Sequence, residues 1–180
     1  GTIFFGSNAS IFRISSGGGT PTAVITFDQA KGERYILPEV LPSGRALIFT
    51  TLLNTAESRI EVQRLDTGER HTLLSGAADA RYVPTGHLVY MKTGTLMAVP
   101  FDLERLQITG APVALIENVM QAVNAPNTNR ETLQGQFAVS NSGTLLYLPG
   151  GIYSNPQFLP MWVHRDGQTK PLAAAPTQSW

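Results

Sequence analysis

A pattern of one turn followed by short strands recurs along the chain and constrains its fold more than any other feature of the sequence. The pattern is clearest in residues 41–74, which hold in order a turn, a strand, a second strand, a second turn and a third strand: Pro42-Ser43-Gly44, Leu47-Ile48-Phe49, residues 60–65, Asp66-Thr67-Gly68 and residues 70–74. Short apolar runs bounded by Gly, Pro and Asp are typical of antiparallel strands joined by tight turns. We therefore predict a β-meander in this stretch.

The first turn of this unit, with a glycine followed by an apolar and aromatic strand, recurs at Gly44, Gly86 and Gly143, which are 42 and 57 residues apart. A period of forty-odd residues with four short strands in each unit is typical of a β-propeller. Its four-stranded antiparallel blades cover their apolar faces by stacking on one another. The predicted fold is therefore all-β, with approximate blades over residues 1–30, 35–77, 78–119 and 133–175.

The chain holds about four such blades, and the first of them lacks an inner strand before Gly1. Roughly four to eight blades close a propeller ring. An open stack would leave apolar faces and strand edges bare. We therefore expect this chain to be part of a larger propeller, or to form homo-oligomers that cover the open faces.

Composition excludes several classes of function. The chain has thirteen basic and thirteen acidic residues, and this zero net charge gives no electrostatic footprint for nucleic acid. No apolar run approaches the roughly 20 residues that span a bilayer, so we expect no membrane insertion by this segment. There is no cysteine, which excludes disulfides and a cysteine nucleophile.

The sequence contains no recognisable catalytic or metal-binding constellation. His71, His87 and His164 occupy different places in the repeat, so they are not expected to converge on a metal. Gly-x-Ser-x-Gly, the nucleophile elbow of α/β-hydrolases, does not occur. We predict no catalytic residue, no metal and no cofactor, and we expect the chain not to be an enzyme.

The axial opening of a propeller is the default place for a ligand, because the loops leading into the inner strands surround it. The polar residues of this chain at those places are Arg34, Tyr35, Asp79, Arg81, Asn129, Arg130 and Gln136. An ordinary surface role is the alternative for each of them. Together Arg34, Arg81 and Arg130 would present cationic groups to an acidic ligand or a peptide carboxylate.

Several segments follow one another in an order that is specific to one class of repeat: Gly1-Thr2-Ile3-Phe4-Phe5, Ile11-Phe12-Arg13-Ile14, Leu41-Pro42-Ser43-Gly44, Leu65-Asp66-Thr67-Gly68, Val99-Pro100-Phe101-Asp102 and Trp162-Val163-His164-Arg165-Asp166-Gly167. Over nearly its whole length the chain resembles the TolB-like, WD-repeat-like β-propellers in the C-terminal regions of bacterial serine/threonine protein kinases. The resemblance implies a sensor or interaction module, often extracytoplasmic, and supplies no catalytic residues.

Two classes of function remain open at this point. The first is a non-catalytic module of a bacterial signalling protein that binds a protein, a peptide or a small molecule. The second is the propeller domain of a hydrolase, either a gating domain like that of prolyl oligopeptidase or a metal-dependent propeller hydrolase. An enzyme of the second kind would need carboxylates, histidines or a serine elbow that converge on the axis.

Overall fold

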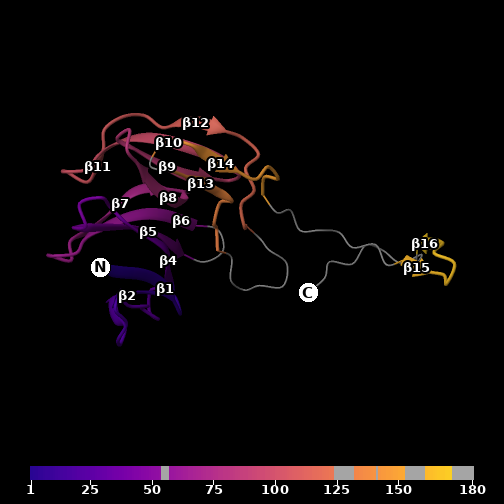
Figure 1. Ribbon diagram of the computed structural model, residues 1–180, viewed down its shortest axis with the longest axis horizontal. Helices are drawn as coiled ribbons and strands as arrows, with labels where there is room; N and C mark the ends of the chain where they lie inside the picture. Colours follow the sequence, from indigo (N-terminus) through magenta and orange to yellow (C-terminus); the bar gives the residue numbers. More distant parts are fainter. Residues whose placement is uncertain (54–56, 124–131, 141, 153–160, 172–180) are drawn as a thin grey trace.

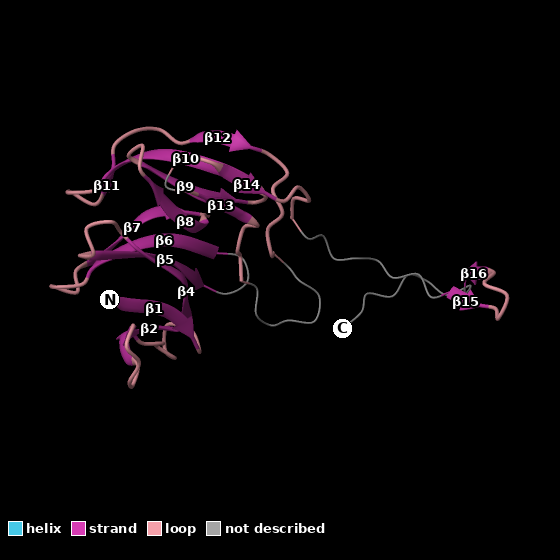
Figure 2. Ribbon diagram, viewed as in Figure 1, coloured by secondary structure: helices cyan, strands magenta, loops and turns pink. Residues whose placement is uncertain are grey.

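A computed structural model of the chain describes residues 1–53, 57–123, 132–140, 142–152 and 161–171. All regular secondary structure in these ranges is β-strand, as Figure 2 shows. In this part of the chain, no helix is long and apolar enough to cross a membrane.

The strands form successive antiparallel sheets along the chain. The first sheet has three strands, β1 (Thr2–Ser7), β2 (Ser10–Ser15) and β3 (Thr22–Ile25). The second has four strands, β4 (Glu33–Val40), β5 (Ala46–Leu53), β6 (Glu57–Arg64) and β7 (Arg70–Ser75). The third sheet contains β8 (Ala78–Val83), β9 (His87–Lys92), β10 (Thr95–Asp102), β11 (Gln107–Ile108) and β12 (Val113–Ile116). We call these sheets blade 1, blade 2 and blade 3.

Two shorter sheets follow blade 3. They pair β13 (Phe137–Val139) with β14 (Leu145–Tyr147), and β15 (Met161–Val163) with β16 (Thr169–Pro171). In Figure 1 the β13–β14 sheet lies with the blades, whereas the β15–β16 hairpin lies apart from them. The four-stranded blade over residues 133–175 therefore stays a prediction.

A separate apolar core joins each of blades 1, 2 and 3 to the sheet that follows it. Ile11 and Ile25 of blade 1 pack with Leu47 and Phe49 of blade 2. The core between blades 2 and 3 is larger and includes Ile48, Ile60, Val62, Leu88, Tyr90, Val99 and Phe101. A third cluster joins Met91 and Leu96 of blade 3 to Phe137 of β13. Antiparallel blades stacked in chain order in this way are the architecture of a β-propeller, which confirms the predicted fold class.

The recurring turn glycines have a common backbone conformation. Gly44, Gly86 and Gly143 have φ values of 68°, 79° and 88°, and each ends a turn between the first two strands of its sheet. Glycine adopts positive φ without the steric cost that a Cβ brings. This requirement explains why the sequence returns to glycine at this place in each repeat.

Candidate ligand-binding site

The first strands of blades 2 and 3, β4 and β8, share an irregularity in their pairing. The pairing register shifts between Ile36 and Glu39 in β4 and between Ala78 and Arg81 in β8. Within these shifts, Leu37 and Asp79 have positive φ values of 53° and 50°. Bulges of this kind redirect side chains, and they often occur beside functional sites.

A cavity of about 540 Å³ lies against β4, the first strand of blade 2. It is bounded by the β1–β2 turn, by β4 from Arg34 to Pro38, and by Thr132 and Gln134. Its polar lining comes from Ser7, Asn8, Arg34, Thr132 and Gln134. Small-molecule sites in proteins usually have volumes of about 300–1,000 Å³, so this cavity is large enough to hold a ligand.

Arg34 is the one cationic residue of this lining. Its side chain is half-buried, and within the described ranges no carboxylate lies at salt-bridge distance from its guanidinium. A guanidinium carries five N–H donors in a planar fork that matches a carboxylate or phosphate. Arg34 is therefore the predicted residue whose environment suits a ligand best.

Tyr35 lines the same cavity but does not offer its hydroxyl to it. The ring is buried, the hydroxyl donates a hydrogen bond to Glu33 Oε2 at 2.7 Å, and the Arg70 guanidinium lies 5.2 Å from the ring centroid. Burial and the hydrogen bond to Glu33 raise the pKa of Tyr35. The Tyr35 side chain thus belongs to the core between blades 1 and 2.

Asp79 and Arg81 lie together on β8, away from this cavity. Asp79 is only 4% exposed, and its Oδ2 accepts a hydrogen bond of 2.8 Å from the Gly135 amide. Its own amide donates to Thr50 Oγ1 at 3.0 Å, so Asp79 connects blade 3 to blade 2 and to the segment before β13. Burial raises the pKa of Asp79 despite the nearby Arg81. These contacts give Asp79 a structural role.

Arg81 stacks on an aromatic ring while it pairs with Asp79. Its guanidinium lies 4.6 Å from the Phe137 ring centroid, and its Nη2 lies 3.5 Å from Asp79 Oδ1. The side chain is partly exposed, which leaves donors free for solvent or a ligand. Arg81 is not part of the cavity lining that contains Arg34.

The remaining predicted residues contribute less to the site. Gln136 has an exposed side chain, and its backbone amide donates to Met120 O at 2.8 Å. Asn129 and Arg130 lie outside the described residues. The structure therefore brings together Arg34 with Tyr35 and Asp79 with Arg81, but it does not gather all the predicted residues in one place.

The structure also shows polar residues that join different parts of the fold and that the sequence did not reveal. Glu39 Oε1 accepts a hydrogen bond from the Tyr82 amide at 2.8 Å and so joins blades 2 and 3. Gln121 is buried, accepts from the Gly94 amide at 2.9 Å and donates to Leu133 O at 2.9 Å. Gln121 lies in the polar segment between the third and fourth repeats. The only available signal was polarity, which does not distinguish a buried glutamine from an exposed one.

His71 and His87 make separate contacts with backbone carbonyls. His71 Nε2 lies 3.0 Å from Leu106 O, and His87 Nδ1 lies 3.0 Å from Thr85 O. Within the described ranges, no group of three or more His, Cys, Asp or Glu residues is placed to hold a metal ion.

Known protein families give no match to this chain, and no curated protein sequence matches it. Solved structures do resemble it in fold. A Mycobacterium tuberculosis puromycin-hydrolyzing peptidase aligns with 99% of this chain at a TM-score of 0.51 and 13% identity. The β-propeller domain of the Trilobed protease from Pyrococcus furiosus aligns with 64% of the chain at a TM-score of 0.45 and 13% identity. The chain spans 37% and 38% of those two proteins, respectively. At this identity, the likeness to the peptidase concerns the fold alone.

Proposed function

We propose that this chain is a non-catalytic binding module and that its ligand occupies the cavity beside Arg34. The observation that carries the proposal is the half-buried Arg34 in a cavity of about 540 Å³ with polar groups from two blades and the segment at 132–134. The fork of donors on Arg34 favours a carboxylate or another planar anion, and Ser7, Asn8, Thr132 and Gln134 supply further hydrogen-bonding groups. The resemblance to TolB-like propellers supports the role of an extracytoplasmic sensor in a bacterial signalling protein.

The proposal is tested with short peptides that have a free C-terminal carboxylate and with the same peptides amidated at the C-terminus. We expect isothermal titration to show binding of the free-acid peptides to the wild-type chain. Arg34→Ala should weaken this binding by at least about tenfold, since a hydrogen bond to a charged group contributes roughly 1.5–3 kcal/mol.

Arg45→Ala is the matched control, because Arg45 is an exposed arginine in the turn between β4 and β5. It should leave the affinity unchanged. Binding that is equal for the free-acid and amidated peptides, or unaffected by Arg34→Ala, would contradict the role of Arg34. A failure of both sets of peptides to bind would contradict a peptide carboxylate as the ligand.

The propeller domain of a hydrolase is the second candidate. The observation in its favour is the likeness over 99% of this chain to a puromycin-hydrolyzing peptidase. In such a protein the catalytic groups would lie in another domain of the same polypeptide. The full-length gene distinguishes the candidates, because a kinase domain beside this segment supports the sensor and a hydrolase domain supports the second function.

A further inference from the structure

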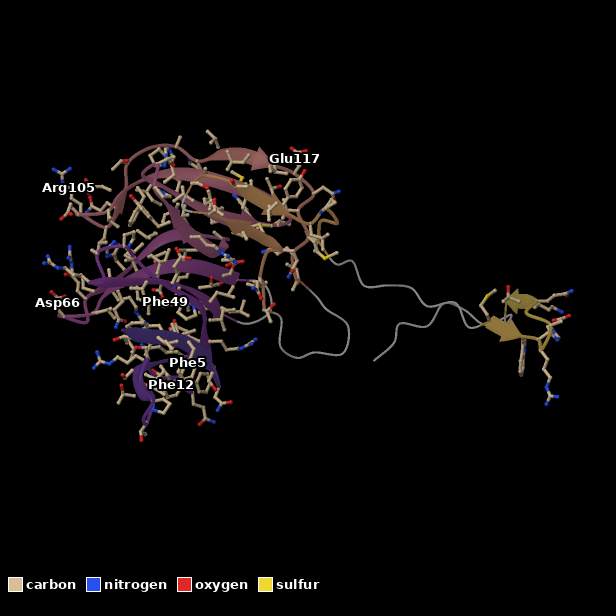
Figure 3. All side chains as sticks on the ribbon, viewed as in Figure 1. Phe5, Phe12, Phe49, Asp66, Arg105 and Glu117 are labelled. Atoms are coloured by element: carbon tan, nitrogen blue, oxygen red, sulfur yellow. The ribbon has the colours of Figure 1, made fainter. Side chains whose placement is uncertain are left out.

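Another cavity, of about 470 Å³, lies between blades 2 and 3. Its walls come from β6 and β7 of blade 2 and from β11 and the turn before it in blade 3, and its polar lining consists of Arg64, Glu69, His71, Arg105 and Gln107. Figure 3 shows Arg105 and the β6–β7 turn residue Asp66 on the same side of the stack. The volume is within the roughly 300–1,000 Å³ that is usual for small-molecule sites.

The pairing of strands in blade 2 sets one wall of this cavity. Ile60 and Val62 of β6 lie in the core between blades 2 and 3. Side chains alternate along a strand, so Arg64 faces blade 3 as well. His71 of β7 pairs with Val62, and cross-strand partners lie on the same face of a sheet. Arg64 and His71 are therefore directed at blade 3.

The turn between β10 and β11 forms the opposite wall. Asp102 Oδ1 accepts hydrogen bonds of 2.9 Å from the amides of Glu104 and Arg105, which fixes the backbone of this turn. Leu106 is 3% exposed in the core that blades 2 and 3 share, and its carbonyl accepts a hydrogen bond of 3.0 Å from His71 Nε2. The two walls are thus joined directly, so the packing of the two blades holds the cavity in shape.

The cavity carries more positive than negative charge, although the whole chain has no net charge. In the described part of the chain, its lining includes two guanidinium groups and one carboxylate, that of Glu69. Arg64 Nε lies 3.9 Å from Glu69 Oε2, which is too long for a hydrogen bond. Arg105 Nη1 lies 3.2 Å from Asp102 Oδ2, and the Arg105 side chain is 77% exposed. Each guanidinium has five N–H donors, so both arginines keep donors for a ligand.

We propose that this cavity binds a small phosphate monoester between Arg64 and Arg105. The guanidinium fork matches a carboxylate or a phosphate. The oxygens of a phosphate point in several directions, so it accepts hydrogen bonds from arginines on two facing walls, whereas a single guanidinium matches a planar carboxylate. A phosphate group does not fill a cavity of this size, which leaves room for an organic group beside Glu69 and Gln107. The site does not depend on the ligand proposed for the cavity beside Arg34.

An NMR titration of the isotope-labelled chain tests the proposal with inorganic phosphate, glycerol phosphate and glycerol, each at constant ionic strength. Phosphate and glycerol phosphate should shift the amide signals of the residues that line the cavity, in a saturable way, and glycerol should not. Arg64→Ala and Arg105→Ala should each weaken this binding by at least about tenfold, because each removes hydrogen bonds to a charged group.

Glu69→Gln should act in the opposite direction. The Glu69 carboxylate repels a phosphate in the same cavity, and its side chain is 72% exposed, so the substitution should not disturb the fold. Removal of this charge should strengthen phosphate binding by up to about fivefold. A gain of affinity cannot arise from loss of structure, and far-ultraviolet circular dichroism checks that each variant is folded.

Arg13→Ala is the matched control, since Arg13 is an exposed arginine of β2 in blade 1, and it should leave the affinity unchanged. Arg34→Ala should also leave it unchanged. Shifts that gather around Arg34 or disappear in Arg34→Ala would place the phosphate in the other cavity and overturn this proposal, but not the proposed function. Equal shifts with sodium chloride, no binding of glycerol phosphate, or an affinity that Arg64→Ala and Arg105→Ala leave unchanged would overturn it as well.

Discussion

At the scale of single residues, the sequence predicted the turns much better than the buried charges. Gly44, Gly86 and Gly143 were recognisable because positive φ selects glycine wherever the turn recurs. The contacts of Asp79 were not recognisable, because they depend on Gly135, which lies 56 residues away in the segment before β13. A local pattern reports local backbone geometry, whereas a hydrogen bond between blades depends on how the blades are stacked.

Glu39 leads to a prediction about the pH dependence of stability. Burial raises the pKa of this carboxyl, although the hydrogen bond from the Tyr82 amide and the charge of Arg81 lower it; the charge of Asp79 also raises it. A pKa that folding raises contributes stability below the unfolded pKa, and this contribution is lost as pH rises through the folded pKa. Since glutamine cannot ionise, Glu39→Gln should gain stability relative to the wild type between about pH 4 and pH 7.

Urea unfolding of both proteins across this pH range measures the difference in their free energies of unfolding. Glu104→Gln, at an exposed position, serves as the control and should show no such trend. A difference between Glu39→Gln and the wild type that does not change with pH would contradict a raised pKa at Glu39.

At the scale of the elements, the sequence located most strands but not the charged network that joins them. The predicted segments at residues 47–49, 60–65 and 70–74 fall largely within β5, β6 and β7. In contrast, β4 begins at Glu33, before residue 35, where the sequence predicted that this blade begins. Glu33, Arg59 and Glu61 share one face of blade 2, but their partnership depends on the register of three strands.

Arg59 holds two buried carboxylates on different strands, and its removal should destabilise blade 2. Its Nη2 lies 2.8 Å from Glu33 Oε1 on β4, and its Nε lies 3.3 Å from Glu61 Oε1 on the same strand as Arg59. Arg59→Ala leaves both carboxylates without their partner, so we expect the free energy of unfolding to fall by about 3–5 kcal/mol. Denaturant unfolding measures this loss.

The exposed pair Arg105–Asp102 provides the comparison, and Arg105→Ala should cost at most about 1 kcal/mol. Equal losses for the two variants would contradict a structural role for the network.

At the scale of the whole molecule, the sequence repeat predicted that the blades stack on one another, because the repeat extends along most of the chain. Apolar strands of this period cannot cover both faces alone, so they had to pack on one another. The sequence could not predict which of the predicted polar residues share a cavity. That depends on the β1–β2 turn and residues 132–134 approaching β4 from distant parts of the chain.

The cores between blades predict that damage to one blade spreads to the next. Ile60 of blade 2 is fully buried in the cluster that also contains Leu88 and Tyr90 of blade 3. Ile60→Ala should lower the free energy of unfolding by about 2–5 kcal/mol through lost burial and the cavity left behind. Because blade 3 shares this core, hydrogen exchange should also become faster in β9, where no residue has changed.

The control is Val113→Ala, at a side chain that is 55% exposed, and it should alter the free energy of unfolding by no more than about 0.5 kcal/mol. If exchange in β9 keeps its wild-type rate in Ile60→Ala, each blade is stable by itself and the stack does not unfold as a unit.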